Sequence, residues 1–247
     1  MLGRLSYWVY RGACGLVRLF YRKPAFEGLE NLPEGACVIV GNHAQMNGPI
    51  IAELYIPGDR AIWCAEEMMH LKEVPAYAYS DFWSGKPACT RWFFRLASYA
   101  IAPLSVCVFN NAHCIGVYRD MRVMSTFRES VAGLRRGMKI VIFPETDPPV
   151  NDILYTFQDR FIDLGRMYAH AAGQTLRFVP MYVAPALKKV FFGPPIAYDD
   201  TADPNEERAR IAAALTRSIT EIAVRQPRHR VVPYRNVSKN SYPMNKP

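Results

Sequence analysis

The chain has 247 residues, of which 50% are apolar and 21% charged, so it can bury a substantial core and wholesale disorder is excluded. Its 30 basic and 22 acidic residues give a net charge of +8, which suits an anionic partner such as nucleic acid, an anionic membrane face or a phosphorylated small molecule. The 6 cysteines form no Cys-x-x-Cys pair, and the histidines form no cluster at metal-ligand spacing. We therefore expect neither a disulfide framework nor a metal site.

Residues 1–23 are the first predicted element, an amphipathic helix that ends at Lys23-Pro24. The segment has no acidic residue, and its arginines recur at spacings of 7, 7 and 4, which places them on one face. A basic face combined with aromatic and aliphatic residues is typical of a helix that lies in a membrane surface. The alternative is a helix docked on its own domain with a solvated arginine face. The arginines are Arg4, Arg11, Arg18 and Arg22.

Residues 24–225 alternate between predicted strands and helices. The strands are continuous apolar runs, which is typical of a parallel sheet covered on both faces. We therefore predict an α/β fold, a single domain with a largely parallel central sheet flanked by helices and preceded by the N-terminal helix. Residues 226–247 are predicted to be a basic, poorly ordered tail. The predicted strands are 36–40, 60–64, 113–118, 138–143, 176–183 and 189–192, and helices are expected to begin near Pro49, Asp120, Asp159 and Pro204.

Residues suited to chemistry follow the predicted strands where these end. Asn42 and His43 come after the first of these strands, Arg119 after the third, and Phe143-Pro144-Glu145-Thr146 close the fourth. Ligands bind at strand ends in α/β sheets. A histidine can act there as a general base near neutral pH, and an arginine suits a phosphate because its planar fork donates two parallel hydrogen bonds.

In this order, and with a Val-Pro pair at Val179-Pro180, the motifs resemble those of the glycerolipid acyltransferases, in particular the bacterial 1-acylglycerol-3-phosphate (lysophosphatidic acid) type. The resemblance runs from about Phe20 to Ile196. It implies an O-acyltransferase of phospholipid biosynthesis, in which a histidine takes the proton of a glycerol hydroxyl that attacks an acyl thioester.

Carried to this chain, the resemblance implies His43 as the base, Arg119 as a phosphate ligand and Glu145 as a residue of the acceptor site. Asn42 and the flanking Phe143, Pro144 and Thr146 are expected to contribute to substrate binding. The acyl donor is acyl-CoA or acyl-carrier protein, the acceptor is a lysophospholipid, and no cofactor is implied.

The chain departs from the family pattern at two places. The histidine motif of the family places an aspartate five residues after the histidine, where this chain has Gly48, and the family's Phe-Pro-Glu-Gly-Thr-Arg reads Phe-Pro-Glu-Thr-Asp-Pro. The missing aspartate holds the histidine in its useful tautomer, so another group has to do so here. Asn47 is a candidate because an amide oxygen can accept from an imidazole N–H. Glu145, Asp147 and Asp81 are alternatives.

The predicted enzyme lies on the cytoplasmic face of a membrane, peripheral or monotopic, with an anionic membrane surface as its partner and no nucleic acid. An alternative, favoured by Gly48, is a lipid-binding protein of the same fold without turnover. A third possibility is the same chemistry on a different lysolipid. The apolar residues between Trp92 and Phe109 are either plain core or lipid-contacting, in an acyl-chain groove or in the bilayer; their continuous apolar run is shorter than the about 20 residues that a spanning helix needs.

Overall fold

The computed structural model describes residues 2–234 and 245, and their contacts group into two compact units. Unit 1 comprises Met1–Arg22 and Trp63–Thr126, and unit 2 comprises Lys23–Ile62 and Phe127–Pro247. Each unit is discontinuous in sequence, because the chain leaves unit 2 within one strand and returns to it within one helix. The two units are described in turn.

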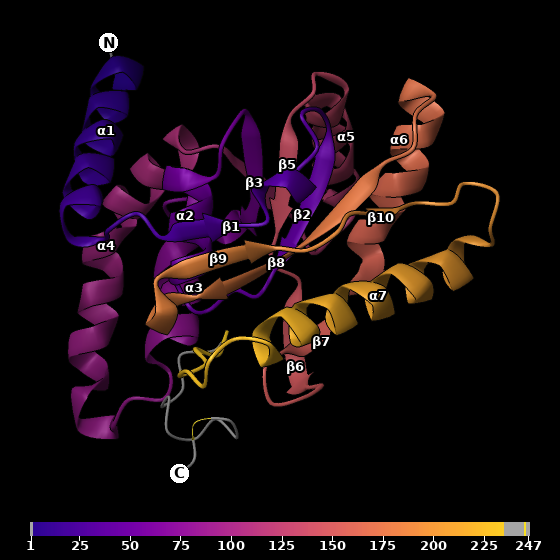
Figure 1. Cartoon of the computed structure of the whole chain (residues 1–247). Helices are drawn as coiled ribbons and strands as arrows, with labels where there is room; N and C mark the ends of the chain where they lie inside the picture. Colours follow the sequence, from indigo (N-terminus) through magenta and orange to yellow (C-terminus); the bar gives the residue numbers. More distant parts are fainter. Residues whose placement is uncertain (1, 235–244, 246–247) are drawn as a thin grey trace. The chain divides into compact units, whose positions relative to one another are not determined.

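Unit 2 is built on a mostly parallel sheet (Figure 1). The strand order is β1-β9-β8-β2-β5-β3, with β10 paired to β8. β2 pairs in parallel with β5 and β8, β3 with β5, and β1 with β9, whereas β9 and β10 run antiparallel to β8. The predicted α/β class and its parallel central sheet are confirmed. The strands are β1 (Ala25–Glu27), β2 (Cys37–Gly41), β3 (Arg60–Ala65), β4 (Cys114–Val117, which belongs to unit 1), β5 (Lys139–Ile142), β8 (Arg177–Ala184), β9 (Lys189–Phe192) and β10 (Ile196–Ala197).

The centre of this sheet is the core of unit 2. All residues of β2 and β5 are buried, and Ile39 on β2 lies between Val141 on β5 and Val179 on β8. Continuous apolar strands are what a sheet covered on both faces requires, so this part of the pattern was readable in the sequence.

The helices of unit 2 are amphipathic and turn an apolar stripe inward. In the last of them Ile211, Leu215 and Ile219 are fully buried, and the helix packs on β8. Asp203 begins that helix by accepting from the backbone N–H groups of Asn205 and Glu206, at 2.9 and 3.1 Å. The helices are α2 (Asn47–Tyr55), α5 (Val123–Arg135, which begins in unit 1), α6 (Leu164–Ala172, after a 3₁₀ helix Asp159–Asp163) and α7 (Pro204–Val224).

A two-stranded antiparallel hairpin, β6 (Glu145–Pro149) with β7 (Tyr155–Phe157), follows β5 and was not predicted. It extends directly from the Phe-Pro-Glu motif, and Glu145 is its first residue, opposite Phe157. The candidate site is thus attached to a hairpin on one side and to the parallel sheet on the other.

Residues 226–234, predicted as the start of a poorly ordered tail, pack on unit 2. The His229 Nε2 atom lies 2.7 Å from the Tyr182 hydroxyl, and Val231 is 1% exposed and packs on Tyr155. Apolar Val231 and Val232 give this segment a surface to bury, which its basic composition obscured. The rest of the predicted tail, apart from Asn245, lies outside the described residues.

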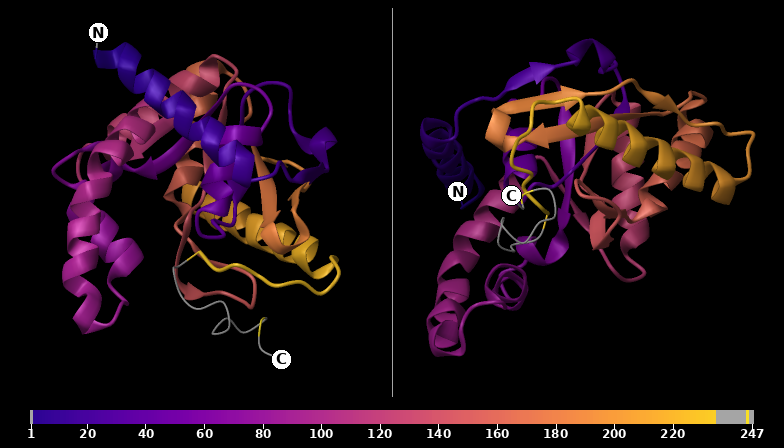
Figure 2. Two further views of the ribbon diagram at one scale, coloured as in Figure 1. Left: turned by 90° about the vertical axis from the view of Figure 1, so that its left-hand side faces the viewer. Right: turned by 60° about the horizontal axis from the view of Figure 1, so that its bottom comes forward.

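Unit 1 is mainly helical and contains the predicted N-terminal helix (Figure 2). Helix α1 (Leu2–Phe20) packs along α4 (Arg91–Asn111), where the Cys107 thiol donates to the Ser6 carbonyl at 3.2 Å. A small core of Met68, Val74, Ala78 and Ala102 joins α4 to α3 (Val74–Ala78) and to the 3₁₀ helix Glu66–Met69. Further short elements are a π-helical turn Tyr79–Trp83 and 3₁₀ helices Leu29–Asn31, Ala88–Thr90 and Pro185–Leu187, of which the first and last belong to unit 2.

Candidate active site

The ends of β2 and β5 bring the two motifs of the sequence together in unit 2. These strands are parallel neighbours with Val40 opposite Ile142, so the residues that follow them emerge at the same edge of the sheet. His43 and Glu145 are in direct contact there. The backbone N–H of His43 donates to Glu145 Oε2 at 2.6 Å.

Asn42 ties the end of β2 to β8. Its side-chain amide donates to the Val183 carbonyl at 3.0 Å, and its side-chain oxygen accepts from the Val183 N–H at 2.7 Å. The residue is buried, at 2% exposure. Asn42, expected to bind substrate, therefore holds the two strands together beside His43.

Glu145 supports the site from inside. Its Oε1 atom accepts from the Tyr155 N–H at 3.2 Å while Oε2 accepts from His43, and the residue is 8% exposed. Burial raises the pKa of this carboxyl to about 7, because an apolar environment disfavours the charged form, while the two backbone donors act in the opposite direction. Both oxygens face backbone groups of the protein, so the carboxylate connects β2 to the hairpin.

The His43 ring has a defined tautomer. Its Nδ1 atom contacts the backbone carbonyl of Gln45, and since a carbonyl can only accept, Nδ1 carries the proton. Nε2 is then the basic nitrogen. Burial lowers the pKa of His43, so the ring is neutral at physiological pH and Nε2 keeps its lone pair. The Phe143 ring packs against the imidazole in a T-shaped arrangement, with 5.4 Å between centroids.

A tight turn delivers that carbonyl. Ala44 and Gln45 both have left-handed backbone conformations, with φ of 47° and 56°. For residues other than glycine this costs about 1–2 kcal/mol each, and such strain concentrates at functional sites. The turn closes with Asn47, whose backbone and side-chain N–H groups both donate to the Ala44 carbonyl, at 3.1 and 2.8 Å.

The sequence left the group that orients His43 open among Asn47, Glu145, Asp147 and Asp81. In the structure the Asn47 amide donates to the Ala44 carbonyl, and the group that contacts His43 Nδ1 is the Gln45 carbonyl. No pattern of side chains could have revealed it, because the group belongs to the backbone. The nearest signal was the absence of the expected aspartate.

Gly48 is enclosed where the family has its aspartate. A Cβ atom there would lie 2.7 Å from the His43 carbonyl oxygen and 2.7 Å from Cε1 of Phe143. Carbon atoms do not approach so closely, and the His43 carbonyl is also bonded to the Gly48 N–H at 3.0 Å. A side chain at position 48 would therefore have to displace the turn.

The remaining predicted residues of unit 2 lie close by in the chain. Phe143 fills the space between His43 and Gly48, and the Pro144 carbonyl accepts from Gln158 N–H at 2.9 Å. Thr146 stands on β6 opposite Thr156.

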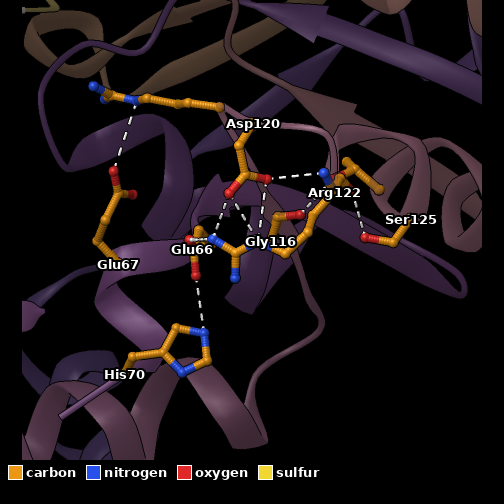
Figure 3. A network of polar contacts seen from close by, with 9 residues as sticks. Glu66, Glu67, His70, Gly116, Asp120, Arg122 and Ser125 are labelled. Carbon is orange, nitrogen blue, oxygen red and sulfur yellow. Dashed lines mark hydrogen bonds and ion pairs between the residues drawn. The ribbon is translucent and has the colours of Figure 1, made fainter. Parts of the chain in front are cut away.

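Arg119 belongs to unit 1 and has its own setting there. It is largely exposed, and its Nε atom lies 3.6 Å from Glu67 Oε1. Sequence reasoning missed Arg122, which lies in the neighbouring polar network of Figure 3. Arg122 bonds both oxygens of Asp120, at 3.1 and 3.0 Å, and reaches Glu66 Oε1 at 3.0 Å. The sequence signal for this contact was an aspartate, Asp120, with arginines one residue before it and two residues after it.

Comparison with known proteins finds similarity among solved structures. No protein-family model matches the sequence, and no curated protein matches it. Among solved structures, the chain is similar to the 1-acyl-sn-glycerophosphate (LPA) acyltransferase PlsC of Thermotoga maritima, with 14% identity over 91% of this chain and 81% of that chain and a TM-score of 0.48. At this identity and TM-score the likeness concerns the course of the chain and not its chemistry.

Proposed function

We propose that the protein is an O-acyltransferase that moves a fatty acyl chain from an acyl thioester to the hydroxyl of a glycerophosphate-type lysolipid. The observation on which this rests is the setting of His43. Its Nδ1 proton is directed to a backbone carbonyl, its main chain is fixed by Glu145, and its lowered pKa keeps Nε2 available as a base. A general base needs an unprotonated nitrogen held in place; the two contacts hold the ring and the lowered pKa keeps Nε2 unprotonated.

The proposed step begins when His43 Nε2 accepts the proton of the acceptor hydroxyl. The alkoxide oxygen forms a C–O bond with the thioester carbonyl carbon, and the carbonyl oxygen becomes an oxyanion. The oxyanion collapses, the C–S bond breaks, and the thiolate takes the proton back from Nε2–H. The products are an ester and a free thiol, and the base is regenerated.

The Gln45 carbonyl has the role of the missing aspartate in this proposal. Its negative end stabilises the imidazolium that forms during the step, though less strongly than a full charge would. A thioester is an activated donor, so less stabilisation suffices. The lowered pKa makes His43 a weaker base, but one that stays unprotonated, and a weaker base suffices for an activated thioester donor.

Further parts of the proposal rest on the sequence motifs. Arg119 is proposed to bind the acceptor phosphate and Thr146 to line the acceptor site, with acyl-CoA or acyl-carrier protein as donor substrate and no cofactor. We place the enzyme in phospholipid biosynthesis at the cytoplasmic face of a membrane.

The test uses the purified full chain with a long-chain acyl-CoA and 1-acylglycerol-3-phosphate, and follows thiol release together with diacyl product. We expect product from the wild type and from His170→Ala, a control at an exposed histidine of α6, and none from His43→Ala. A panel of lysolipids and donors extends the assay if this pair is not the preferred one.

A lipid-binding protein without turnover is the second candidate, because the group that contacts His43 Nδ1 is a backbone carbonyl and carries no full charge. It predicts lysolipid binding that survives His43→Ala and no thiol release with any donor and acceptor of the panel. That combination would contradict the acyltransferase proposal.

A further inference from the structure

Helix α4 of unit 1 carries an exposed row of large apolar side chains, called here the α4 ridge. These side chains are between 52% and 69% exposed, although they include the largest of the helix. Trp92 and Phe93 lie four and three residues before Leu96, and Tyr99 lies three residues after it. Leu104 follows Tyr99 by five residues, and at about 3.6 residues per turn the whole row falls on one side of the helix. The α4 ridge consists of Trp92, Phe93, Leu96, Tyr99 and Leu104.

The inner side of α4 is only partly apolar, with the half-buried Ile101, Val106 and Phe109 packed on the small core of unit 1. Its buried residues are Ser98, Ala102 and Ser105, which are small or polar. Ser98 bonds the Arg95 carbonyl at 2.7 Å and Ser105 the Met68 carbonyl at 3.1 Å, so the two hydroxyls are satisfied inside. A helix that buries serine and exposes tryptophan and leucine has its apolar side directed at an apolar medium.

The charges around the α4 ridge fit an anionic lipid surface. Arg91 and Arg95 lie in the first turns of α4, both exposed, and α4 contains no acidic residue. Helix α1, packed along α4, adds exposed arginines at positions 4, 11 and 18 and exposed Trp8 and Leu19. Aromatic and aliphatic side chains beside arginines are the composition of an element that lies at the boundary of headgroups and acyl chains.

We propose that the α4 ridge, with the neighbouring arginines of α1, inserts into one leaflet of an anionic bilayer and holds the protein on its surface. Helix Ala88–Asn111 is long and apolar enough to cross a membrane, with 17% of its apolar window buried. The opposite side of α4 packs on α3 and on the 3₁₀ helix, and Asn110 bonds the Met69 carbonyl at 2.9 Å, so the ridge side is the one that meets lipid. In this proposal the helix lies in the plane of the surface.

Residues 92–109 divide between the two readings, because Ile101, Val106 and Phe109 pack on the core of unit 1. The side chains of the α4 ridge are not core, because they are exposed. They are the lipid-contacting part of unit 1. The proposal does not depend on acyl transfer, since surface binding requires no turnover.

The experiment is flotation of the full chain with vesicles of phosphatidylcholine alone or mixed with phosphatidylglycerol. We expect the chain to float with the mixed vesicles and less with phosphatidylcholine, and this difference to shrink in high salt because salt screens the arginines. The double variant Trp92→Asp/Leu96→Asp should lower the partition coefficient by more than about tenfold, because it removes two inserted side chains.

Matched controls make the result specific. Val150→Asp and Val224→Asp place the same charge at exposed apolar positions of unit 2 and should float like the wild type. His43→Ala should also float like the wild type, so that failed acyl transfer and failed membrane binding are told apart. Thermal melting of each variant confirms that it is folded.

Two outcomes would overturn the proposal. One is a Trp92→Asp/Leu96→Asp protein that is folded and floats as well as the wild type. The other is a wild type that does not float and is a dimer in solution, together with a Trp92→Asp/Leu96→Asp variant that is a monomer. The α4 ridge would then be covered by a second copy of the chain.

Discussion

Replacing Gly48 by aspartate would give this chain the histidine motif of the acyltransferases that its sequence resembles, and the structure predicts that the change disables the site. The new Cβ would lie 2.7 Å from the His43 carbonyl oxygen and 2.7 and 3.0 Å from two atoms of the Phe143 ring. The optimal distance between non-bonded carbon atoms is about 3.5–4.0 Å, so His43 or Phe143 has to move by roughly half an ångström or more. The His43 carbonyl is anchored by its own hydrogen bond to the backbone N–H of residue 48.

The magnitude follows from overpacking and misplacement. Overfilling a packed site costs about 1–3 kcal/mol, which lowers the melting temperature of a chain of this size by about 2–12 °C. Moving the base by about 1 Å costs about 10²-fold in rate. We therefore expect Gly48→Asp to lower both the melting temperature and kcat/KM.

Two controls separate the causes. Gly48→Ala adds the same Cβ without a carboxylate and should lose stability to a similar extent. Gly35→Ala adds a Cβ where no atom lies within 4 Å and should change neither quantity. A folded Gly48→Asp protein with higher kcat/KM than the wild type would refute the assignment of the orienting role to the Gln45 carbonyl.

Three further predictions concern the same site. Because burial lowers the pKa of His43 below its ordinary 6.5 and the base acts in its neutral form, the acidic limb of the kcat/KM–pH profile should lie below pH 6.5; a limb above it contradicts the proposed base. The pKa of Glu145 is raised from 4.5 to about 7, so its contribution to stability is complete below pH 4.5 and lost as pH rises through 7. Urea denaturation should show about 3 kcal/mol of this loss in the wild type and much less in Glu145→Gln. Asn42→Ala removes both side-chain bonds to Val183 and should lower the unfolding free energy in the same urea measurement by about 2–4 kcal/mol; an unchanged value contradicts the role of Asn42 in holding β2 to β8.

The sheet could be predicted because its central strands are continuous apolar runs. The predicted strands at 36–40 and 138–143 agree with β2 and β5 within a residue or two. The β6–β7 hairpin could not be predicted, because β6 contains Pro148 and Pro149 and no turn signature separates it from the loop. β1 and β10 are short, and their pairing depends on partners distant in the sequence.

The meeting of His43 and Glu145 was predictable from the rule that parallel strands end at a common edge. The contacts that each of these two residues makes could not be predicted. Glu145 accepts from two backbone N–H groups, and these partners come from β7 and from the end of β2, which only the fold brings together. The exposure of the α4 ridge could not be predicted for a similar reason, because an apolar sequence does not show which side of its helix faces inward.

The backbone origin of the orienting group leads to a last prediction, at Gln45. If the carbonyl matters and the side chain does not, activity should follow the tolerance of each substitution for a left-handed conformation at φ 56°. Glycine and asparagine adopt this conformation readily, so Gln45→Gly and Gln45→Asn should retain most of the wild-type kcat. Valine is strongly disfavoured there because its branched Cβ crowds the backbone.

Gln45→Val should therefore turn the carbonyl away from Nδ1 and lower kcat by about 10²-fold, the scale of a base misplaced by about 1 Å. The acidic limb of the pH profile should shift in this variant, since the carbonyl is one of the groups that raise the pKa of His43. Loss of its contact lowers the pKa further, and the limb moves to more acidic pH. Equal losses in Gln45→Asn and Gln45→Val would instead assign the role to the glutamine side chain.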